Sequence, residues 1–305
     1  MALSDIAGVF SRYLIVGFFL PAFFVIVAAS LLVTDGLLPR EYRELGDGTK
    51  IVVLGGAGLL IALLLSGLHL SLLRVLEGYP LDRRQQRWYV RWPYALAIRR
   101  ARKQFAALAS DMQLPRGDPR RRRAAQRLAR YYPPRRWDLL PTRFGNAVRS
   151  FERHPRSRWG LDGVVIWPRI ELLLNEQQKE THTGAQTDVA FFVNFVVLLL
   201  AADVALAVDL VLNTSREAYK FALLLVPVGL AWALYRAAVE AAVRWGQVVR
   251  ATFDLYRLPL YRGLGVKVPT GPAEEQVIAE FVNRCLWYGE PIPEAARSSS
   301  EGGKE

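Results

Sequence analysis

Cysteine and histidine are scarce in this chain, which has only Cys285, His69, His154 and His182. A single cysteine cannot close an internal disulfide. One cysteine and three histidines leave too few ligands for a zinc site of the Cys and His type. We therefore expect no disulfide, no bound metal and no cofactor.

The sequence also lacks the short motifs of common catalytic sites. Gly48-Thr49-Lys50 has no preceding glycine at the spacing that a phosphate-binding loop needs, and there is no GxSxG or HExxH. Six carboxylates that could act as acids or bases all have arginines nearby in the sequence, so salt bridges explain them: Glu77, Asp82, Asp138, Glu152, Asp162 and Glu171. No residue is assigned as catalytic, and the sequence favours a role other than an enzyme's.

Long apolar runs are abundant. The mean hydropathy is +0.13 although 22% of the residues are charged, which indicates apolar blocks separated by charged ones. A helix needs roughly 20 apolar residues to cross a bilayer core of about 30 Å. Four blocks qualify: residues 13–33, 51–73, 188–212 and 221–243. They predict an all-α protein, with a four-helix transmembrane bundle and a helical basic domain between the second and third membrane helices. The first block could instead be a signal peptide cut after Val27-Ala28-Ala29, but its apolar run continues past that site, which favours an anchor.

The Lys and Arg residues beside the blocks predict the orientation. Nine of them lie on one side and five on the other, and the richer side is expected to be cytoplasmic. Residues 1–12, the basic domain 74–187 and a helical tail 244–295 are then inside, and loops 34–50 and 213–220 are outside. A disordered tail is expected at 296–305. Arginine outnumbers lysine 34 to 6, a bias typical of a high-GC bacterial genome, so we expect a bacterial plasma membrane.

Three of the blocks contain residues that affect helix shape or packing, namely prolines in the first and fourth and a row of small residues in the second. Pro21 and Pro227 are expected to kink the first and fourth helices, either as static bends or as hinges. Gly58, Ala62 and Ser66 recur every four residues on the second helix, a ridge that allows another helix to approach closely. The partner could belong to the bundle or to a second copy of the chain.

Three polar residues inside the blocks are candidates for an intramembrane site. Asp203 would cost about 2.5–3.5 kcal/mol to insert unless it has a partner or a wet cavity. Counting residues from the helix ends puts Arg236 level with Asn194, which predicts that these two pair. Asp203 could either pair with a structural partner or bind an ion or a proton.

The segment between the second and third blocks is the source of the positive charge. Residues 74–187 contain 25 Lys and Arg against 10 Asp and Glu, a net charge of +15 compared with +12 for the whole chain. Trp88, Trp92 and Tyr94 lie among arginines, a mixture typical of the membrane–water boundary. Candidates for contact with anionic lipid are Arg83, Arg84, Arg87, Arg120, Arg121, Arg122 and Arg123. A run of four arginines such as 120–123 is usually a solvated helix face; contact with anionic lipid is the second explanation and nucleic acid the third.

Two amphipathic helices are expected in the basic domain and the tail. From Leu96 to Met112, apolar residues at steps of three and four form one stripe, which could lie on the inner leaflet or cover a small core. Residues 273–288 should form the second helix, with one apolar side made of Val277, Phe281, Cys285 and Tyr288.

The stretch 140–169 combines an apolar helical face with a dense set of polar residues. Phe144, Val148 and Phe151 are spaced as one face of a helix that His154-Pro155 ends. We expect a fixed polar network, structural or catalytic, made of Arg143, Asn146, Arg149, Glu152, Asp162 and Arg169. Val164–Trp167 is a short apolar run closed by Pro168.

Four stretches, RVLEGYP (74–80), PTRFGN (141–146), WPR (167–169) and FDLYRLPL (253–260), resemble a family of uncharacterised integral membrane proteins of high-GC bacteria. The likeness covers most of the chain. It implies the four-span topology and little about chemistry.

Two functions are consistent with these observations. One is a membrane-anchored scaffold or sensor whose basic domain engages anionic lipid head groups or a cytoplasmic protein partner. The other is an oligomeric ion channel or transporter that uses Asp203, Asn194 and Arg236, which would need several copies of the chain. Nucleic acid is disfavoured as a partner, because membrane helices at both ends hold the arginines at a lipid surface.

Overall fold

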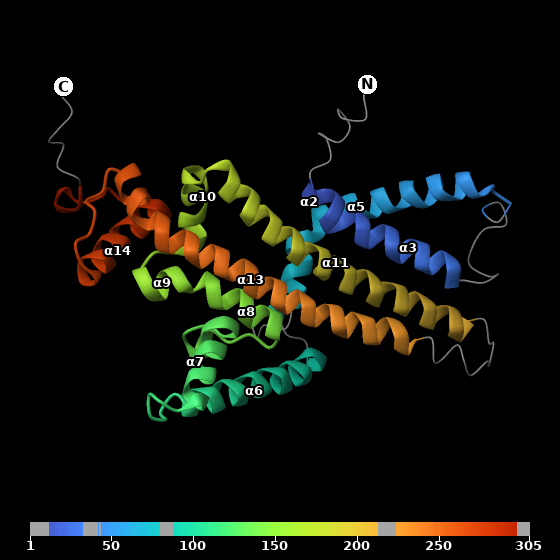
Figure 1. Ribbon diagram of the computed structural model, residues 1–305, viewed down its shortest axis with the longest axis horizontal. Helices are drawn as coiled ribbons and strands as arrows, with labels where there is room; N and C mark the ends of the chain where they lie inside the picture. Colours follow the sequence, from blue (N-terminus) through green and yellow to red (C-terminus); the bar gives the residue numbers. More distant parts are fainter. Residues whose placement is uncertain (1–11, 33–41, 43, 80–87, 213–223, 298–305) are drawn as a thin grey trace, which may run out of the picture. The chain divides into compact units, whose positions relative to one another are not determined.

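The computed structural model describes residues 12–32, 42, 44–79, 88–212 and 224–297, and the expected all-α class is confirmed over these residues (Figure 1). No β-strand occurs among them; Val266 and Arg297 form an isolated antiparallel bridge. The helices are α2 (Arg12–Leu14), η1 (Ile15–Phe19), α3 (Leu20–Leu32), α5 (Asp47–Glu77), α6 (Trp88–Asp111), α7 (Pro119–Tyr131), η4 (Arg136–Asp138), α8 (Arg143–Glu152), α9 (His154–Trp159), α10 (Gly163–Leu173), α11 (Glu176–Leu212), α13 (Leu225–Gly263), α14 (Pro272–Tyr288) and η5 (Glu294–Ala296).

The chain divides into two compact units, each made of two stretches of sequence. The first unit is Met1–Leu76 with Thr183–Ala242, and the second is Glu77–His182 with Val243–Glu305. Most of the expected basic domain 74–187 therefore belongs to the same unit as the expected tail 244–295, although the sequence predicted two separate domains.

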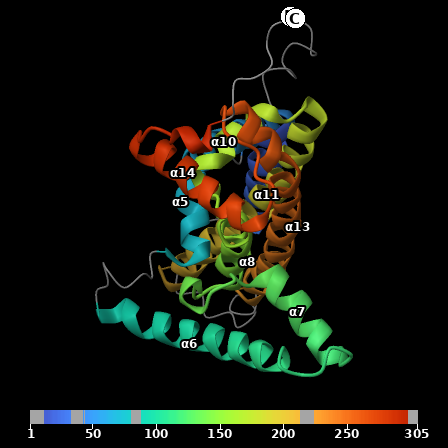
Figure 2. The same cartoon turned by 90° about the vertical axis from the view of Figure 1, so that its left-hand side faces the viewer.

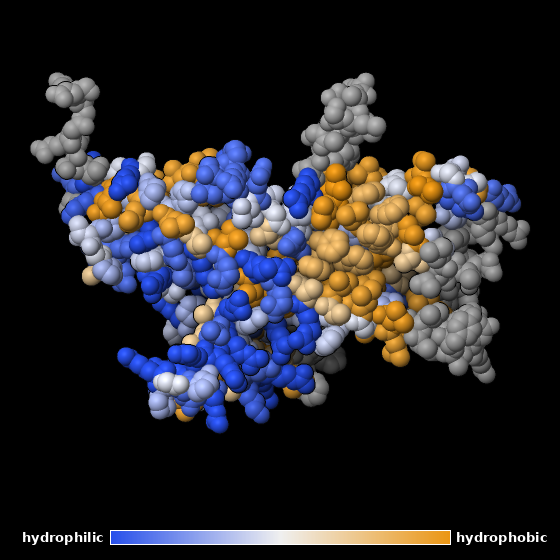
Figure 3. Space-filling view, in the orientation of Figure 1, coloured by the Kyte–Doolittle hydropathy of each residue, from blue (hydrophilic) through white to orange (hydrophobic). Residues whose placement is uncertain are grey.

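Four helices are long and apolar enough to cross a membrane: Arg12–Ser30, Asp47–Glu77, Glu176–Val208 and Leu225–Gly263. Large apolar side chains point outward from them, as Val52 and Leu70 show with 73% and 71% of their surface exposed. Apolar residues predominate on the face of the first unit that Figure 3 shows. An outward apolar surface of this extent marks contact with a membrane or with another protein.

The small-residue ridge on α5 packs within the chain. Ala62 and Leu65 of α5 join Phe18 and Ala190 in a buried cluster. A Cβ placed on Gly58 would meet the ring of Phe19 at 3.4 Å, so glycine lets the first helix lie close to α5. Two of the three ridge residues thus serve bundle packing, whereas the third, Ser66, is exposed and bonds back to its own helix.

The two prolines behave differently. A π-helical turn, η1, ends at Phe19, two residues before Pro21, so the first helix departs from regular α-helical geometry near the proline, while the expected kink stays a prediction. The expected kink at Pro227 is wrong, because α13 begins only at Leu225. Proline in the first turn of a helix removes no intrahelical hydrogen bond.

Helices α6 and α7 of the second unit pack against each other (Figure 2). The apolar stripe of α6 is turned inward, with Ile98 and Ala101 buried. Phe105 meets the ring of Tyr132 edge-on at 5.9 Å, and the Tyr132 hydroxyl donates to Gln104 at 3.1 Å. Of the two alternatives for this stripe, the structure supports a small protein core.

Three local expectations in the second unit need correction. Pro168 does not close an apolar run, because α10 continues through it to Leu173. Helix α14 forms as expected, but it buries Ile278, Ala279 and Val282 and leaves Val277 and Tyr288 exposed. The expected disordered tail starts two residues too early. Ala296 is buried and accepts a hydrogen bond from the Lys267 N–H at 3.0 Å, and Arg297 forms the bridge to Val266. Residues 298–305 lie outside the described part.

Candidate functional site

Two of the singled-out stretches meet where α5 ends and α8 begins. Gly78 has a φ of +89°, a left-handed conformation that favours glycine. A Cβ on Gly145 would lie 2.3 Å from the Glu77 carbonyl oxygen and 2.9 Å from the Glu77 Cα. Only glycine at position 145 therefore allows α8 to touch the end of α5. The glycine of RVLEGYP and the glycine of PTRFGN are both required at this one contact.

Asn146 fixes the loop that leads into α8. Its side chain is almost fully buried, accepts from the Leu140 N–H at 2.8 Å, and donates to the carbonyl oxygens of Leu140 and Thr142 at 2.8 Å each. The Thr142 hydroxyl caps the helix by accepting from the Gly145 N–H at 2.9 Å. Both polar side chains satisfy backbone groups, which is a structural use.

Arg149 of α8 contacts Tyr79, which lies two residues after the end of α5. It donates to the Tyr79 hydroxyl, lies over the Tyr79 ring at 5.3 Å, and pairs with Glu152 at 3.6 Å. Burial raises the pKa of Glu152 above its ordinary range, and the positive charges of Arg149 and Arg153 oppose that shift. The ion pair therefore offsets a burial cost, and we assign it no large net stabilisation.

The FDLYR stretch of α13 contacts α9 through one carboxylate. Asp254 Oδ1 accepts from the Trp159 indole at 2.8 Å and lies 3.1 Å from His154 Nε2. Arg257 lies over the Trp159 ring at 3.7 Å and pairs with the buried Glu275 at 2.9 Å. The contacts of Asp254 and Arg257 with α9 join residues about 100 positions apart, and they are one reason why the basic segment and the tail form one unit.

The tryptophan of WPR lies half-buried in an aromatic cluster with the buried rings of His182 and Phe253. Its ring is 4.5 Å from that of His182 and 5.9 Å from that of Phe253. The Trp245 indole donates to His182 Nε2 at 3.0 Å, so this nitrogen carries no proton and the imidazole is neutral. All four singled-out stretches thus contribute to the interior of the second unit.

Hydrogen bonds of Asn283 connect α14 to the turn between α9 and α10. Asn283 is buried, accepts from the Asp162 N–H at 2.8 Å and donates to the Gly160 carbonyl at 2.8 Å. Asp162 caps α10 through the Val164 N–H at 3.1 Å and pairs with Arg156 at 3.3 Å.

The expected polar network is therefore several local sets of contacts. Arg149 pairs with Glu152, while Asn146, Asp162 and Arg169 each bond to nearby backbone, Arg169 to the Val165 carbonyl at 2.7 Å. Arg143 is exposed and takes no part. Sequence reasoning missed the contacts of Tyr79 and Asp254, although it singled out their stretches, and it missed His182, Trp245, Glu275 and Asn283 as members of the site. They come from stretches far apart in the chain, so no spacing could have revealed their contacts.

The arginines of α7 form an exposed basic surface. Arg121 donates to the Leu114 carbonyl at 2.7 Å, but the other five arginines of the helix are exposed: Arg120, Arg122, Arg123, Arg127 and Arg130. Within the described ranges none of these five forms an ion pair with a carboxylate. Figure 3 shows hydrophilic residues covering α6 and α7. The candidates Arg83, Arg84 and Arg87 lie outside the described residues.

The three intramembrane candidates are not brought together. Asn194 does not pair with Arg236; it is fully buried and donates to the Gly17 carbonyl at 2.8 Å. Pro21 has no N–H, so this carbonyl lacks the donor that a regular helix would supply from position 21. Arg236 is exposed and lies over the Trp232 ring at 5.2 Å. Asp203 has a buried Oδ1 without a hydrogen bond among the described residues.

Among the described residues, no group of three His, Cys, Asp or Glu side chains could hold a metal ion. The polar side chains of the motif contacts mostly bond to backbone or to each other. These contacts pack the second unit, and the exposed arginine side chains of α7 are one surface of it that remains accessible to a partner. Comparisons with protein-family models, with curated proteins and with solved structures each found no match to this chain.

Proposed function

We propose that the chain is a four-span protein of the bacterial plasma membrane and that its second unit acts in the cytoplasm as a scaffold or sensor docked on anionic lipid. The observation that carries the proposal is the exposed arginine surface of α7, whose charge no carboxylate of the described residues neutralises. The excess of Lys and Arg beside one set of helix ends supports a cytoplasmic position for this unit. We further propose that the chain belongs to the family of membrane proteins that it resembles.

The size of the electrostatic effect favours lipid as the partner. Each Lys or Arg close to an anionic leaflet contributes about 1 kcal/mol, within a Debye length of about 8 Å at physiological salt. Five exposed arginines on a helix of 13 residues could therefore contribute up to about 5 kcal/mol. Tethering by membrane helices would keep these arginines near the leaflet, so the loss of translational entropy on binding would be smaller than for a free domain.

A channel or transporter has weaker support. That alternative uses Asp203, Asn194 and Arg236 together, and no hydrogen bond or ion pair between any two of them is present in the described part of the chain. Asn194 already has a structural partner in the Gly17 carbonyl.

Hydrogen exchange of the full chain in nanodiscs tests the lipid proposal. We expect residues 119–131 to exchange more slowly in discs that contain phosphatidylglycerol than in discs of phosphatidylcholine alone. The difference should vanish at high salt, because the attraction is screened. The triple variant Arg120→Gln, Arg122→Gln, Arg123→Gln should lose the difference. A matched Lys triple at the same positions should keep it, because only charge matters on an exposed surface.

Equal protection in neutral discs would contradict the lipid proposal and point to a protein partner or to contact between copies of the chain. Stronger protection by single-stranded DNA added to neutral discs, at the same salt, would favour nucleic acid instead.

A further inference from the structure

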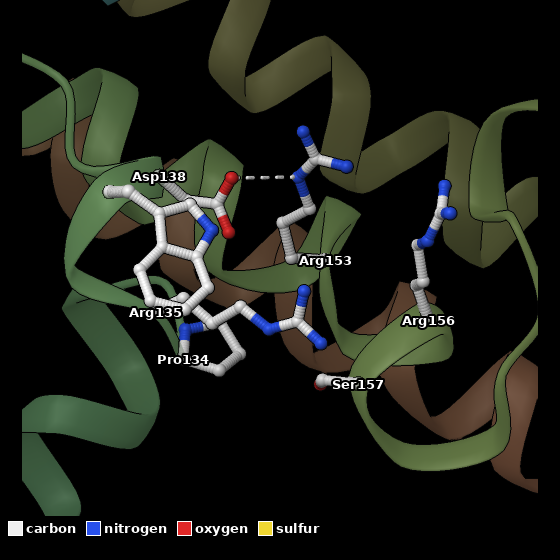
Figure 4. Close-up of a pocket in the computed structure, with 7 residues that line it drawn as sticks. Pro134, Arg135, Asp138, Arg153, Arg156 and Ser157 are labelled. Carbon is white, nitrogen blue, oxygen red and sulfur yellow. Dashed lines mark ion pairs between the residues drawn. The ribbon is translucent and has the colours of Figure 1, made fainter.

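A small cavity opens between the loop that contains η4 and the short helix α9 of the second unit. It has a volume of about 200 Å³ and is lined mainly by Arg135, Trp137, Asp138, Arg153 and Arg156. Figure 4 shows Arg135 of the loop, Arg153 between α8 and α9, and Arg156 of α9 at this cavity, with Asp138 facing Arg153. Three arginines against one aspartate make the lining positive.

Most of the guanidinium donors in the cavity are unused. Arg153 Nε lies 3.4 Å from Asp138, within ion-pair range, yet it is buried and has no hydrogen-bond partner among the described residues. Arg156 uses one nitrogen on Asp162 at 3.3 Å. Arg135 pairs with no described carboxylate and lies over the Trp137 ring at 5.6 Å. Because Arg153 Nε faces Asp138, the donors left for a bound anion are the terminal nitrogens of Arg153 and the guanidinium of Arg135.

The cavity does not offer a hydroxyl donor to a ligand. Ser157 also lines it, but its hydroxyl donates to the His154 carbonyl at 3.1 Å. Recognition would therefore rest on guanidinium groups, whose planar forks suit oxygens of phosphate better than the single ammonium of lysine does.

We infer that this cavity binds a phosphate group, carried either by a free phosphate compound or by a lipid head group. The volume is below the roughly 300–1,000 Å³ typical of sites for drug-sized ligands, so it suits one small anion rather than a nucleotide or a large cofactor. Trp137 stands at the cavity with 76% of its surface exposed, and such a ring can rest at a membrane interface beside a bound head group. The inference goes beyond the proposed lipid docking, because it concerns guanidinium geometry in a defined cavity rather than the charge of α7.

The experiment uses the whole chain at constant ionic strength. In one arm, inorganic phosphate is titrated into the chain in neutral detergent. In the other arm, nanodiscs containing phosphatidic acid, a phosphomonoester, are compared with discs containing the diester phosphatidylglycerol. Affinity is measured as ligand-dependent thermal stabilisation. The test variant is Arg135→Ala, which leaves no described carboxylate unpaired. Its matched control is Arg136→Ala, which removes the same charge from the neighbouring exposed residue that does not line the cavity.

We expect Arg135→Ala to weaken phosphate binding at least tenfold, Arg135→Lys to weaken it nearly as much, and Arg136→Ala to change it less than twofold. Saturation by inorganic phosphate identifies a free ligand. Stabilisation only by phosphatidic acid, beyond that by phosphatidylglycerol, identifies the lipid, and either result supports the site. Equal losses for Arg135→Ala and Arg136→Ala, or no stabilisation in either arm, would overturn the inference. The α7 triple Gln variant should bind phosphate normally, so failure of this site is distinguishable from failure of lipid docking.

Discussion

Replacing Gly145 with alanine is expected to lower the stability of the second unit by about 3 kcal/mol or more, because the new methyl group would overlap backbone. Its Cβ would lie 2.3 Å from the Glu77 carbonyl oxygen and 2.9 Å from the Thr142 hydroxyl. A clash with backbone cannot be relieved by rotating a side chain, so α8 would have to move away from the end of α5. Movement would also strain the three hydrogen bonds of Asn146.

Thermal unfolding of the full chain in detergent, followed by tryptophan fluorescence, measures this effect. A loss of this size should lower the midpoint by roughly 10 °C, at about 2–4 °C per kcal/mol for a unit of this size. Gly184→Ala is the control, because Gly184 also lies inside a helix but nothing lies within 4 Å of its added Cβ. Alanine there should keep or slightly raise the midpoint through its better helix propensity. Equal midpoints for the two variants would show that α8 does not touch α5 in this way.

Gly246→Ala is expected to destabilise the same unit by about 2–3 kcal/mol through overpacking. The Cβ would lie 2.5 Å from Cδ1 and 3.2 Å from Cβ of Phe151, which is 3% exposed and packs edge-on against Trp245 at 4.9 Å. This contact joins the tail stretch to the basic stretch, so the effect tests whether the two form one unit.

Two further variants distinguish the clash with Phe151 from a general effect of alanine on α13. Gly263→Ala, on the same helix and with nothing within 4 Å of its Cβ, should leave the midpoint unchanged. Phe151→Leu should recover part of the loss in the Gly246→Ala background, although it is destabilising alone. Additive losses in the double variant would argue against a contact between these two residues.

Helix class and the face of α8 were predictable because they depend on local periodicity. The apolar blocks are long enough to leave little choice but helix, and Phe144, Val148 and Phe151 are buried as their spacing predicts. The inward stripe of α6 was also recognisable, although only the contact with α7 decided between a protein core and a leaflet.

The face of α14 was mispredicted because two of its buried residues are polar. Glu275 and Asn283 are buried with partners in α13 and in the turn before α10, and apolar periodicity treats such residues as exposed. Their partners lie 18 and more than 120 positions away. Arg143 was misjudged for the opposite reason, since spacing along a helix cannot show how deeply a side chain is buried.

The candidate site was only partly visible in the sequence. The stretch around PTRFGN was singled out correctly, but the reason for its glycine, contact with the Glu77 carbonyl, depends on a segment almost 70 residues earlier. A glycine inside an otherwise good helix is the available signal, since it costs helix stability and so calls for a packing reason. Pro21 likewise shows in the sequence that the Gly17 carbonyl lacks a helical donor, but only the structure shows that Asn194, 177 positions away, supplies one.

Labelling of introduced cysteines by a membrane-impermeant maleimide tests the central claim, a membrane-spanning chain with its basic unit in the cytoplasm. In a Cys285→Ser background, single cysteines replace three exposed residues: Gly48 at the start of α5, Arg122 in α7 and Val277 in α14. We predict that position 48 is labelled in intact cells, and that positions 122 and 277 are labelled only after the membrane is permeabilised. Labelling of position 122 in intact cells would contradict the account.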